Sequence, residues 1–280
     1  MVNTNKRIGL WISAIFFIIS LGILSGCSSD SKATTKEKAF TIGFTPGPYN
    51  EHFQKGVLPA LEKQGYKVKI VEFNSPNEAN PALTNGSIDA NIFQSTAFME
   101  SYAEENKVKL NAVTQVPSAP QGLYSEKHKK IEDVKDGMKI GVPNDPVNME
   151  RALRIIEDLG WIKLNPNLKL LTISEKDISP ADYDLKFVPI ESPQIPRSMQ
   201  DLDYAIINGN LAIDSGRKLT DAFVLEDTPP EHRIIFTVRD EDKDAPFAQA
   251  VKKAFQSKEF KDYFDSQKKY KGFVLPDYMR

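Results

Sequence analysis

Residues 138–160 read MKIGVPNDPVNMERALRIIEDLG and predict a strand, a turn and a helix in immediate succession. The apolar run MKIGV is typical of a buried strand. The helix is expected to begin at Pro146, with Asp145 as its N-cap, because proline suits the first helical position and aspartate accepts hydrogen bonds from free backbone N–H groups. Apolar residues then recur at helical spacing, at Ala152, Leu153, Ile156 and Leu159. A strand that leads directly into an amphipathic helix is the unit of an α/β fold.

The same alternation extends in both directions along the chain. Residues 51–66 have helical spacing and end at Gly65, a short helix is expected around residues 82–84, and residues 246–270 predict helix. The apolar face of that last segment contains Phe247, Val251, Ala254, Phe255, Phe260 and Phe264. Further strands are predicted at FTIGF (40–44), KVKIVEF (67–73), IDANIF (88–93), LKFVPI (185–190), DLDYAIING (201–209) and RIIFTVRDED (233–242). This order favours parallel α/β layers.

The length of the chain favours two lobes. About 250 of the 280 residues follow the N-terminal apolar run, which exceeds the common size of a single domain. We expect the first lobe to contain residues 39–124 and 236–280, and the second lobe to contain residues 125–235. The chain is expected to cross between the lobes near Gly122–Ser125 and again near Ile234–Val238, as a two-segment hinge that closes around a small molecule.

The N-terminus predicts export and lipid attachment. Two basic residues, Lys6 and Arg7, precede an apolar run that falls just short of the roughly 18 residues of a membrane-spanning helix. The run ends in Leu24-Ser25-Gly26-Cys27, which resembles a bacterial lipobox, and this favours a lipoprotein signal peptide over residues 1–26 rather than a transmembrane anchor. Acyl chains such as palmitate on Cys27 would hold the chain on a membrane. The polar residues 27–38 are then a lipid anchor and a flexible tether.

Composition excludes several classes of protein. The formal net charge of −2 gives no indication of a nucleic-acid-binding surface. Cys27 is the single cysteine, so disulfides and cysteine catalysis are not expected in the folded part. The three histidines, His52, His128 and His232, are scattered with no partner at metal-ligand spacing, and His128 and His232 are expected to be solvated. Motifs of zinc proteases, serine hydrolases and phosphate-binding loops are absent. We therefore expect neither catalysis nor a metal or cofactor.

The predicted helix after Asp145 contains a candidate anion site. Asn148 and Arg151 are separated by three residues, so they lie on one face of its first two turns. A helix N-terminus attracts anions, and the arginine fork matches a carboxylate. The alternative is that Arg151 forms a surface pair with Glu150 or Glu157.

Four long stretches resemble one family in the correct order along the chain: PNEANPALTNGSIDANIFQ, VPNDPVNMERAL, IESPQIPRSM and DLDYAIINGN. Over about residues 40–245 the chain is similar to the methionine-binding lipoproteins of ABC importers, the NlpA family. The resemblance implies a two-lobed periplasmic-binding-protein fold (type II). It also implies a receptor on the extracytoplasmic face of the bacterial cell membrane that delivers methionine or a close relative to a permease with a cytoplasmic ATPase.

The resemblance also implies roles for individual residues. Asn148 and Arg151 match the residues that hold the carboxylate end of the ligand, and Asn208 matches an asparagine that holds the amino-acid backbone. Asn208 is also suited to capping the neighbouring backbone, which is the alternative role. Phe93 matches an aromatic residue of the side-chain pocket. Tyr49 follows a strand end, where α/β folds bind ligands, and is a further candidate.

The chain departs from the family at the specificity end of the pocket. It has FQSTAFM where the family usually has FQHKPYL, so Ser95 replaces a histidine and Phe98 a tyrosine, and Pro76 stands where a tyrosine is common. The loss of these polar groups favours looser selectivity, because an apolar pocket discriminates weakly. L-methionine, D-methionine, a derivative, another apolar amino acid or a methionine-containing dipeptide then remain as candidate ligands. The competing functions are an extracytoplasmic sensor or adhesin of the same fold and, from the enzyme class, a two-lobed transferase.

Overall fold

The computed structural model describes residues 38–166 and 177–280. The predicted signal peptide over residues 1–26 and the predicted lipidation site Cys27 lie outside the described residues. In the two described ranges, no helix combines the length and the apolar character needed to cross a membrane.

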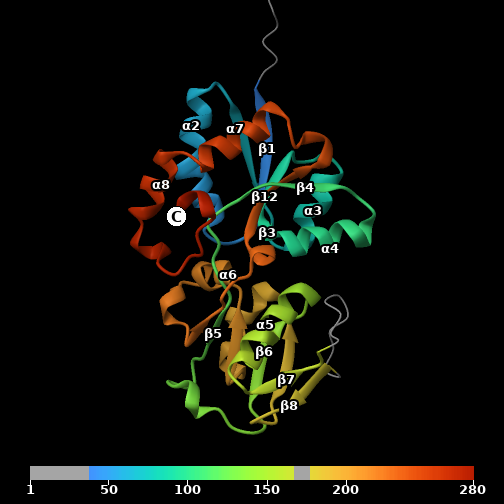
Figure 1. Cartoon of the computed structure of the whole chain (residues 1–280), viewed down its shortest axis with the longest axis vertical. Helices are drawn as coiled ribbons and strands as arrows, with labels where there is room; N and C mark the ends of the chain where they lie inside the picture. Colours follow the sequence, from blue (N-terminus) through green and yellow to red (C-terminus); the bar gives the residue numbers. More distant parts are fainter. Residues whose placement is uncertain (1–37, 167–176) are drawn as a thin grey trace, which may run out of the picture. The chain divides into compact units, whose positions relative to one another are not determined.

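The first lobe is built on a five-stranded sheet in the order β2-β1-β3-β12-β4 (Figure 1). β1 pairs in parallel with both β2 and β3, as the strand and helix alternation predicts. β12 pairs antiparallel with β3 and β4. The bounds of these strands are β1 Ala39–Phe44, β2 Lys67–Glu72, β3 Ala90–Ser95, β4 Leu110–Gln115 and β12 Ile234–Arg239.

Helices cover both sides of this sheet, with α2, α7 and α8 on the left and α3 and α4 on the right in Figure 1. Their bounds are α1 Tyr49–His52, α2 Leu58–Lys63, α3 Pro76–Thr84, α4 Thr96–Asn106, α7 Pro246–Phe255 and α8 Lys258–Asp265. A π-helical turn, Phe53–Val57, joins α1 to α2. Phe44 and Phe53 are fully buried in this lobe.

Two helix predictions need correction. α3 begins at Pro76, six residues before the predicted start, because Ser75 caps it by accepting a hydrogen bond from Asn77 N and proline occupies its first position. The C-terminal segment forms two helices rather than one, since Ser257 begins α8 by capping Phe260 N. Its predicted apolar face does pack into the core, with Phe247 partly buried and the other five residues buried.

The second lobe is built on another five-stranded sheet, in the order β11-β5-β10-β6-β9. β6 pairs in parallel with β9 and β10, whereas β5 pairs antiparallel with β10 and β11. The bounds are β5 Gly122–Tyr124, β6 Lys139–Pro143, β9 Lys186–Ile190, β10 Tyr204–Ile207 and β11 Val224–Leu225. A separate pair contains β7 Ile162–Leu164 and β8 Ile178–Pro180, and the helices are α5 Pro146–Asp158 and α6 Gly209–Asp214.

The chain passes between the two sheets twice, over residues 116–121 (the first crossing) and residues 226–233 (the second crossing). These crossings lie a few residues before the predicted positions near Gly122–Ser125 and Ile234–Val238, because β5 belongs to the second sheet and β12 to the first. The lobe boundary therefore precedes β5. The first crossing is bonded at one end to the start of β12, from Val116 N to Ile234 O (2.8 Å), and at the other end to the second crossing, from Glu226 N to Gln121 O (2.9 Å).

Candidate ligand-binding site

A cavity of about 80 Å³ lies where the strand ends of both sheets meet. In each sheet the lining residues directly follow strands, for example Thr45 after β1, Asn144 after β6 and Asn208 after β10. The carboxyl ends of strands are the usual ligand-binding edge of α/β sheets. Residues from both lobes and from the first crossing contribute: Thr45, Pro46, Pro76, Asn77, Phe93, Gln94, Ser95, Phe98, Ala119, Asn144, Asp145, Asn148, Arg151, Glu191, Ser192, Pro193, Asn208, Gly209, Asn210, Leu211 and Ile234.

The N-terminus of α5 forms the polar wall of the cavity. Asp145 is the N-cap, as predicted, and accepts a hydrogen bond from Asn148 N (2.9 Å). Its carboxylate also accepts two bonds from Asn148 Nδ2, each 3.0 Å long, so the asparagine side chain has a fixed orientation. Asn148 Oδ1 in turn accepts a bond from Arg151 Nη1 (2.9 Å), as their spacing along the helix predicts. Burial raises the pKa of Asp145, and the bonds from Asn148 oppose this rise.

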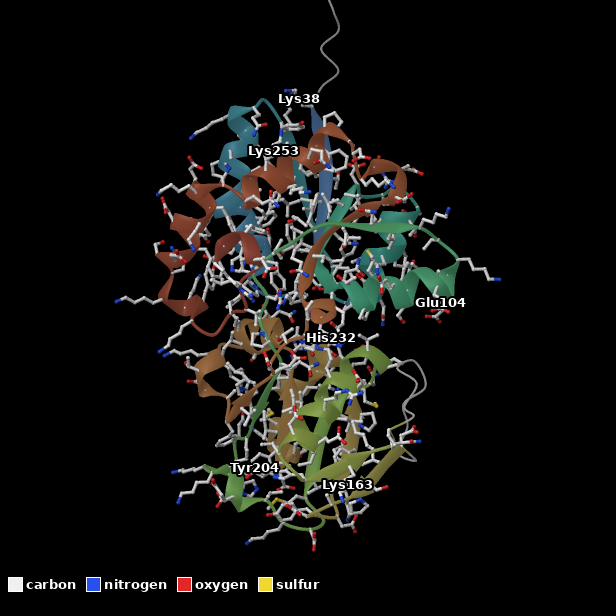
Figure 2. All side chains as sticks on the ribbon, viewed as in Figure 1. Lys38, Glu104, Lys163, Tyr204, His232 and Lys253 are labelled. Carbon is white, nitrogen blue, oxygen red and sulfur yellow. The ribbon has the colours of Figure 1, made fainter. Side chains whose placement is uncertain are left out.

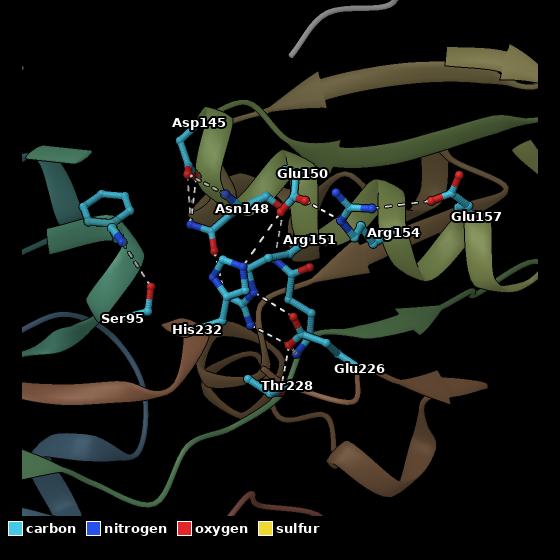
Figure 3. A network of polar contacts seen from close by, with 12 residues as sticks. Ser95, Asp145, Asn148, Glu150, Arg151, Arg154, Glu157, Glu226, Thr228 and His232 are labelled. Carbon is cyan, nitrogen blue, oxygen red and sulfur yellow. Dashed lines mark hydrogen bonds and ion pairs between the residues drawn. The ribbon is translucent and has the colours of Figure 1, made fainter. Parts of the chain in front are cut away.

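Arg151 does not pair with either of the carboxylates that the sequence offered as alternatives. Its partner is Glu226, with Nε to Oε1 at 2.8 Å and Nη2 to Oε2 at 2.6 Å (Figure 3). Both side chains are only 7% exposed. Glu150 and Glu157 instead contact Arg154, one turn further along α5.

Glu226 remains ionised because the effect of its neighbours on its pKa is larger than the opposing effect of burial. Burial disfavours its charge, but the positive charge of Arg151 and the hydrogen bonds from Arg151 and Thr228 lower the pKa of Glu226 below its ordinary value. The Thr228 hydroxyl donates to Oε2 at 2.8 Å, and Gln121 N donates to the same oxygen at 3.3 Å. The pair is therefore a buried, bidentate and further hydrogen-bonded ion pair.

Asn208 lies at the start of α6 but does not cap it with its side chain, so the capping alternative is not what the structure has. Its Oδ1 accepts a bond from Gln121 Nε2 (2.7 Å), and the same nitrogen donates to Asn148 O at 3.2 Å. Gln121 is fully buried. The three predicted polar residues Asn148, Arg151 and Asn208 therefore line one cavity and are connected through Gln121 and Glu226.

The first lobe supplies the apolar wall. The rings of Phe93 and Phe98 meet edge to face, with centroids 5.9 Å apart, and both line the cavity. Ser95 lies between them as the N-cap of α4, and its hydroxyl accepts a bond from Phe98 N at 3.2 Å. Pro76, at the start of α3, lines the same cavity.

A cluster of three buried amide side chains, Asn80, Asn91 and Gln94, packs behind this apolar wall. Gln94 exchanges hydrogen bonds of 2.7 Å with Asn80 and donates to Asn91 at 3.1 Å. All three side chains are at most 2% exposed. The sequence indicates this cluster only in part: the amides Asn91 and Gln94 interrupt a largely apolar strand. It does not show that both amides bond to Asn80 of α3.

Tyr49 is not among the residues that line the cavity. It is the first residue of α1, is 1% exposed, and its hydroxyl accepts a bond from Ala119 N at 3.2 Å. Burial raises the pKa of this hydroxyl above its ordinary value. Tyr49 therefore supports Ala119, a lining residue, from behind.

His232 is buried where the two lobes meet, so the prediction that it is solvated is wrong (Figure 2). Its Nε2 lies 3.8 Å from Glu150, and burial together with the charge of Arg151 lowers its pKa. His128 is half-buried, contrary to the same prediction, and stacks on Tyr204. Within residues 38–166 and 177–280, no three histidine, aspartate, glutamate or cysteine residues form a group suited to a metal ion.

Two α/β lobes, two crossings and a cavity at the strand ends define a protein of the periplasmic substrate-binding class. The family model described as NlpA lipoprotein matches residues 40–278, and the chain belongs to this family. The predicted family and two-lobed fold are thus confirmed.

Similar proteins and solved structures support the same family and fold. The D-methionine-binding lipoprotein MetQ of Salmonella typhi is 33% identical over 250 residues, which cover 88% of this chain and 91% of the relative. MetQ of Escherichia coli (strain K12) is 32% identical with the same coverage. A nutrient-binding protein from Burkholderia cenocepacia bound to methionine has a TM-score of 0.79 and 34% identity, covering 84% of this chain and 99% of the other.

Proposed function

We propose that the chain is a lipid-anchored receptor of an ABC importer that captures methionine, a related amino acid, a methionine derivative or a methionine-containing dipeptide between its lobes. The observation that carries this proposal is the cavity at the strand ends, where a buried arginine, two asparagines and two phenylalanines converge. The names of the relatives, which are binding proteins, support it. The proposed activity is capture and release, without bond chemistry.

The donors of Arg151 fit a ligand carboxylate. A guanidinium has five N–H groups, and the bonds to Glu226 and Asn148 use three of them. Two N–H groups of Arg151 remain, and a carboxylate accepts two hydrogen bonds in a bidentate pair. The Asn208 amide nitrogen, which has no hydrogen bond to another described residue, is a further donor at the cavity wall.

The apolar wall fits a thioether or another uncharged side chain. Phe93 and Phe98 present ring faces and edges, which make favourable contacts with sulfur and with methyl groups. At the positions of Ser95, Phe98 and Pro76, only the Ser95 hydroxyl is able to hydrogen-bond a ligand side chain. We infer that the ligand carboxylate is bound tightly and that the side chain is selected loosely.

The location follows from the N-terminus. We infer that Cys27 carries the lipid and that residues 27–38 tether the receptor to the extracytoplasmic face of the bacterial cell membrane. Ligand binding would shift the population of the two lobes toward a closed arrangement that a permease with a cytoplasmic ATPase recognises.

Isothermal titration calorimetry of the purified protein in detergent tests this function. L-methionine, D-methionine or a methionine dipeptide should bind, and Arg151→Ala should weaken binding by about 1.5–3 kcal/mol, which is about 10- to 100-fold. Arg154→Ala is the matched control, since Arg154 lies on the same helix but is 54% exposed and pairs only with Glu150 and Glu157 of that helix. Equal affinities of Arg151→Ala and wild type would contradict the carboxylate assignment.

A second measurement tests the ligand itself. Mass spectrometry of small molecules released from protein purified without refolding should identify a methionine-like compound. A retained ligand without a carboxylate, or one that the Arg151→Ala variant binds as tightly as wild-type protein does, would exclude the proposed substrate class.

A further inference from the structure

Glu226 is linked, directly or through Gln121 and Arg151, to Asn148, Arg151 and Asn208, although it is not itself among the residues that line the cavity. It lies on the second crossing, 75 residues after Arg151, and holds two of the three guanidinium nitrogens. The third nitrogen, Nη1, donates to Asn148. The orientation of the guanidinium is therefore fixed from two sides by protein groups.

Glu226 also joins the two crossings at the level of the site. Its backbone N donates to Gln121 O, and its Oε2 accepts from Gln121 N and from the Thr228 hydroxyl. The side chain of Gln121 continues to Asn208 Oδ1 and Asn148 O. One connected set of hydrogen bonds thus contains both crossings and the residues Asn148, Arg151 and Asn208. Figure 3 shows the part of it that joins Asn148, Arg151, Glu226 and Thr228.

We propose that Glu226 is a positioning residue of the carboxylate site, which holds Arg151 with its two remaining N–H groups available to the ligand and transmits ligand binding to both crossings. This proposal rests on the proposed function of the cavity. An arginine with four side-chain torsions loses much rotamer entropy when it binds a ligand, and a prior bidentate pair removes that loss from the binding step. A buried arginine without its counter-ion would instead turn toward solvent or another acid.

The affinities for two ligands, L-methionine and L-methioninamide, distinguish a positioning role of Glu226 from a general structural role. L-methionine has the carboxylate that Arg151 is expected to bind, whereas L-methioninamide has a neutral amide in its place. Glu226→Gln should weaken L-methionine by at least about tenfold and change L-methioninamide by less than about twofold. Glu150→Gln is the matched control, because Glu150 is also buried and paired with an arginine, Arg154, yet does not line this cavity. It should change neither affinity.

A measurement without ligand completes the test. In wild-type protein the Nε–H resonance of Arg151 should be protected from solvent exchange in ¹⁵N NMR spectra, and it should lose this protection in Glu226→Gln but not in Glu150→Gln. Unchanged protection in Glu226→Gln, unchanged or tighter L-methionine binding, or equal losses for the two ligands would each overturn the positioning role. If wild-type protein binds neither ligand, the proposed function fails, and the NMR comparison still decides whether Glu226 orients Arg151.

Discussion

His52 is a buried imidazole outside the ligand site. It is 1% exposed, neither ring nitrogen has a hydrogen bond within the described residues, and the rings of Tyr49, Phe264, Tyr270 and Phe273 surround it. Burial, more than the nearby charges, lowers the pKa of His52 to about 3. The imidazole is therefore neutral in the folded protein over the physiological pH range.

This burial makes the folded state sensitive to acid. In the unfolded chain His52 takes up a proton near its ordinary pKa of about 6.5, whereas in the folded chain it stays neutral down to about pH 3. The unfolded state therefore binds more protons below pH 6.5, and its advantage grows by up to about 1.4 kcal/mol per pH unit. The contribution of a neutral His52 is complete above pH 6.5 and is lost as the pH falls toward 3.

The variant His52→Phe should remove this dependence. Its free energy of unfolding relative to wild type, measured by urea denaturation, should rise steadily between pH 7 and pH 4, whatever the offset at neutral pH. The difference at pH 7.5 serves as the baseline. A gap between the two proteins that is constant over this pH range would show that His52 is protonated in the folded state or is more exposed than the structure has it.

At the residue scale, the sequence predicted which side chains meet but not what orients them. Asn148 and Arg151 are three residues apart on one helix, so local spacing places them together, and Asn208 was identified through its resemblance to the family. Glu226 and Gln121 belong to the two crossings, and only the tertiary fold brings them to Arg151. Whether the cavity residues bind ligand stays a prediction.

At the element scale, long apolar patterns were reliable and short segments were not. The strand and helix over residues 138–160 lie where Asp145 and the apolar spacing place them. β5 contains only Gly122–Tyr124, too few residues for an alternating pattern, so the sequence does not distinguish this strand from a hinge. α3 contains a second proline, Pro81. Proline inside a segment usually indicates a loop, so the sequence predicts a helix that begins only after it.

Two serine N-caps with the same hydrogen-bond length allow an effect on helix stability to be distinguished from an effect on ligand binding. Ser95 and Ser257 begin α4 and α8, and each accepts a hydrogen bond of 3.2 Å from the N–H of a phenylalanine three residues later. Only Ser95 lines the cavity. Loss of a serine cap typically costs ~1 kcal/mol.

Ser95→Ala and Ser257→Ala should therefore both lower the free energy of unfolding by about 1 kcal/mol, as measured by denaturant titration. Calorimetry with L-methionine should show a changed affinity for Ser95→Ala alone, because Ser95 lines the cavity and Ser257 does not. A matching change in Ser257→Ala would mean that helix stability, rather than the cavity surface, determines the affinity.

At the scale of the whole molecule, one hydrogen bond joins the loop after β1 to the start of α6. Asn210 Nδ2 donates to Pro46 O at 2.9 Å, and a Cβ atom added to Gly47 would lie 2.8 Å from Asn210 Cβ. The backbone at Gly47 has a φ of 132°, which glycine tolerates and other residues rarely adopt. Glycine therefore permits the two lobes to approach closely beside the cavity.

Asn210→Ala should destabilise the closed arrangement by about 0.5–1.5 kcal/mol, the usual net contribution of one hydrogen bond. The expected result is an affinity for ligand that is about 2- to 10-fold lower, and a larger radius of gyration of the ligand-free protein in X-ray scattering. Asn106→Ala is the control, because its amide bonds to Tyr102 O within a single helix. The prediction fails if both variants scatter and bind as wild type does.

The position of β12 within the first sheet has a consequence for biosynthesis. β12 lies between β3 and β4, yet the whole second sheet separates it from β4 in the sequence. The C-terminal residues return to the same region, where Val274 pairs with Ser118 of the first crossing. As the chain emerges from the ribosome, the second lobe is complete before the first, which must wait for its final strand and helices. A truncated or stalled chain would therefore have no receptor cavity, however well its second lobe had folded.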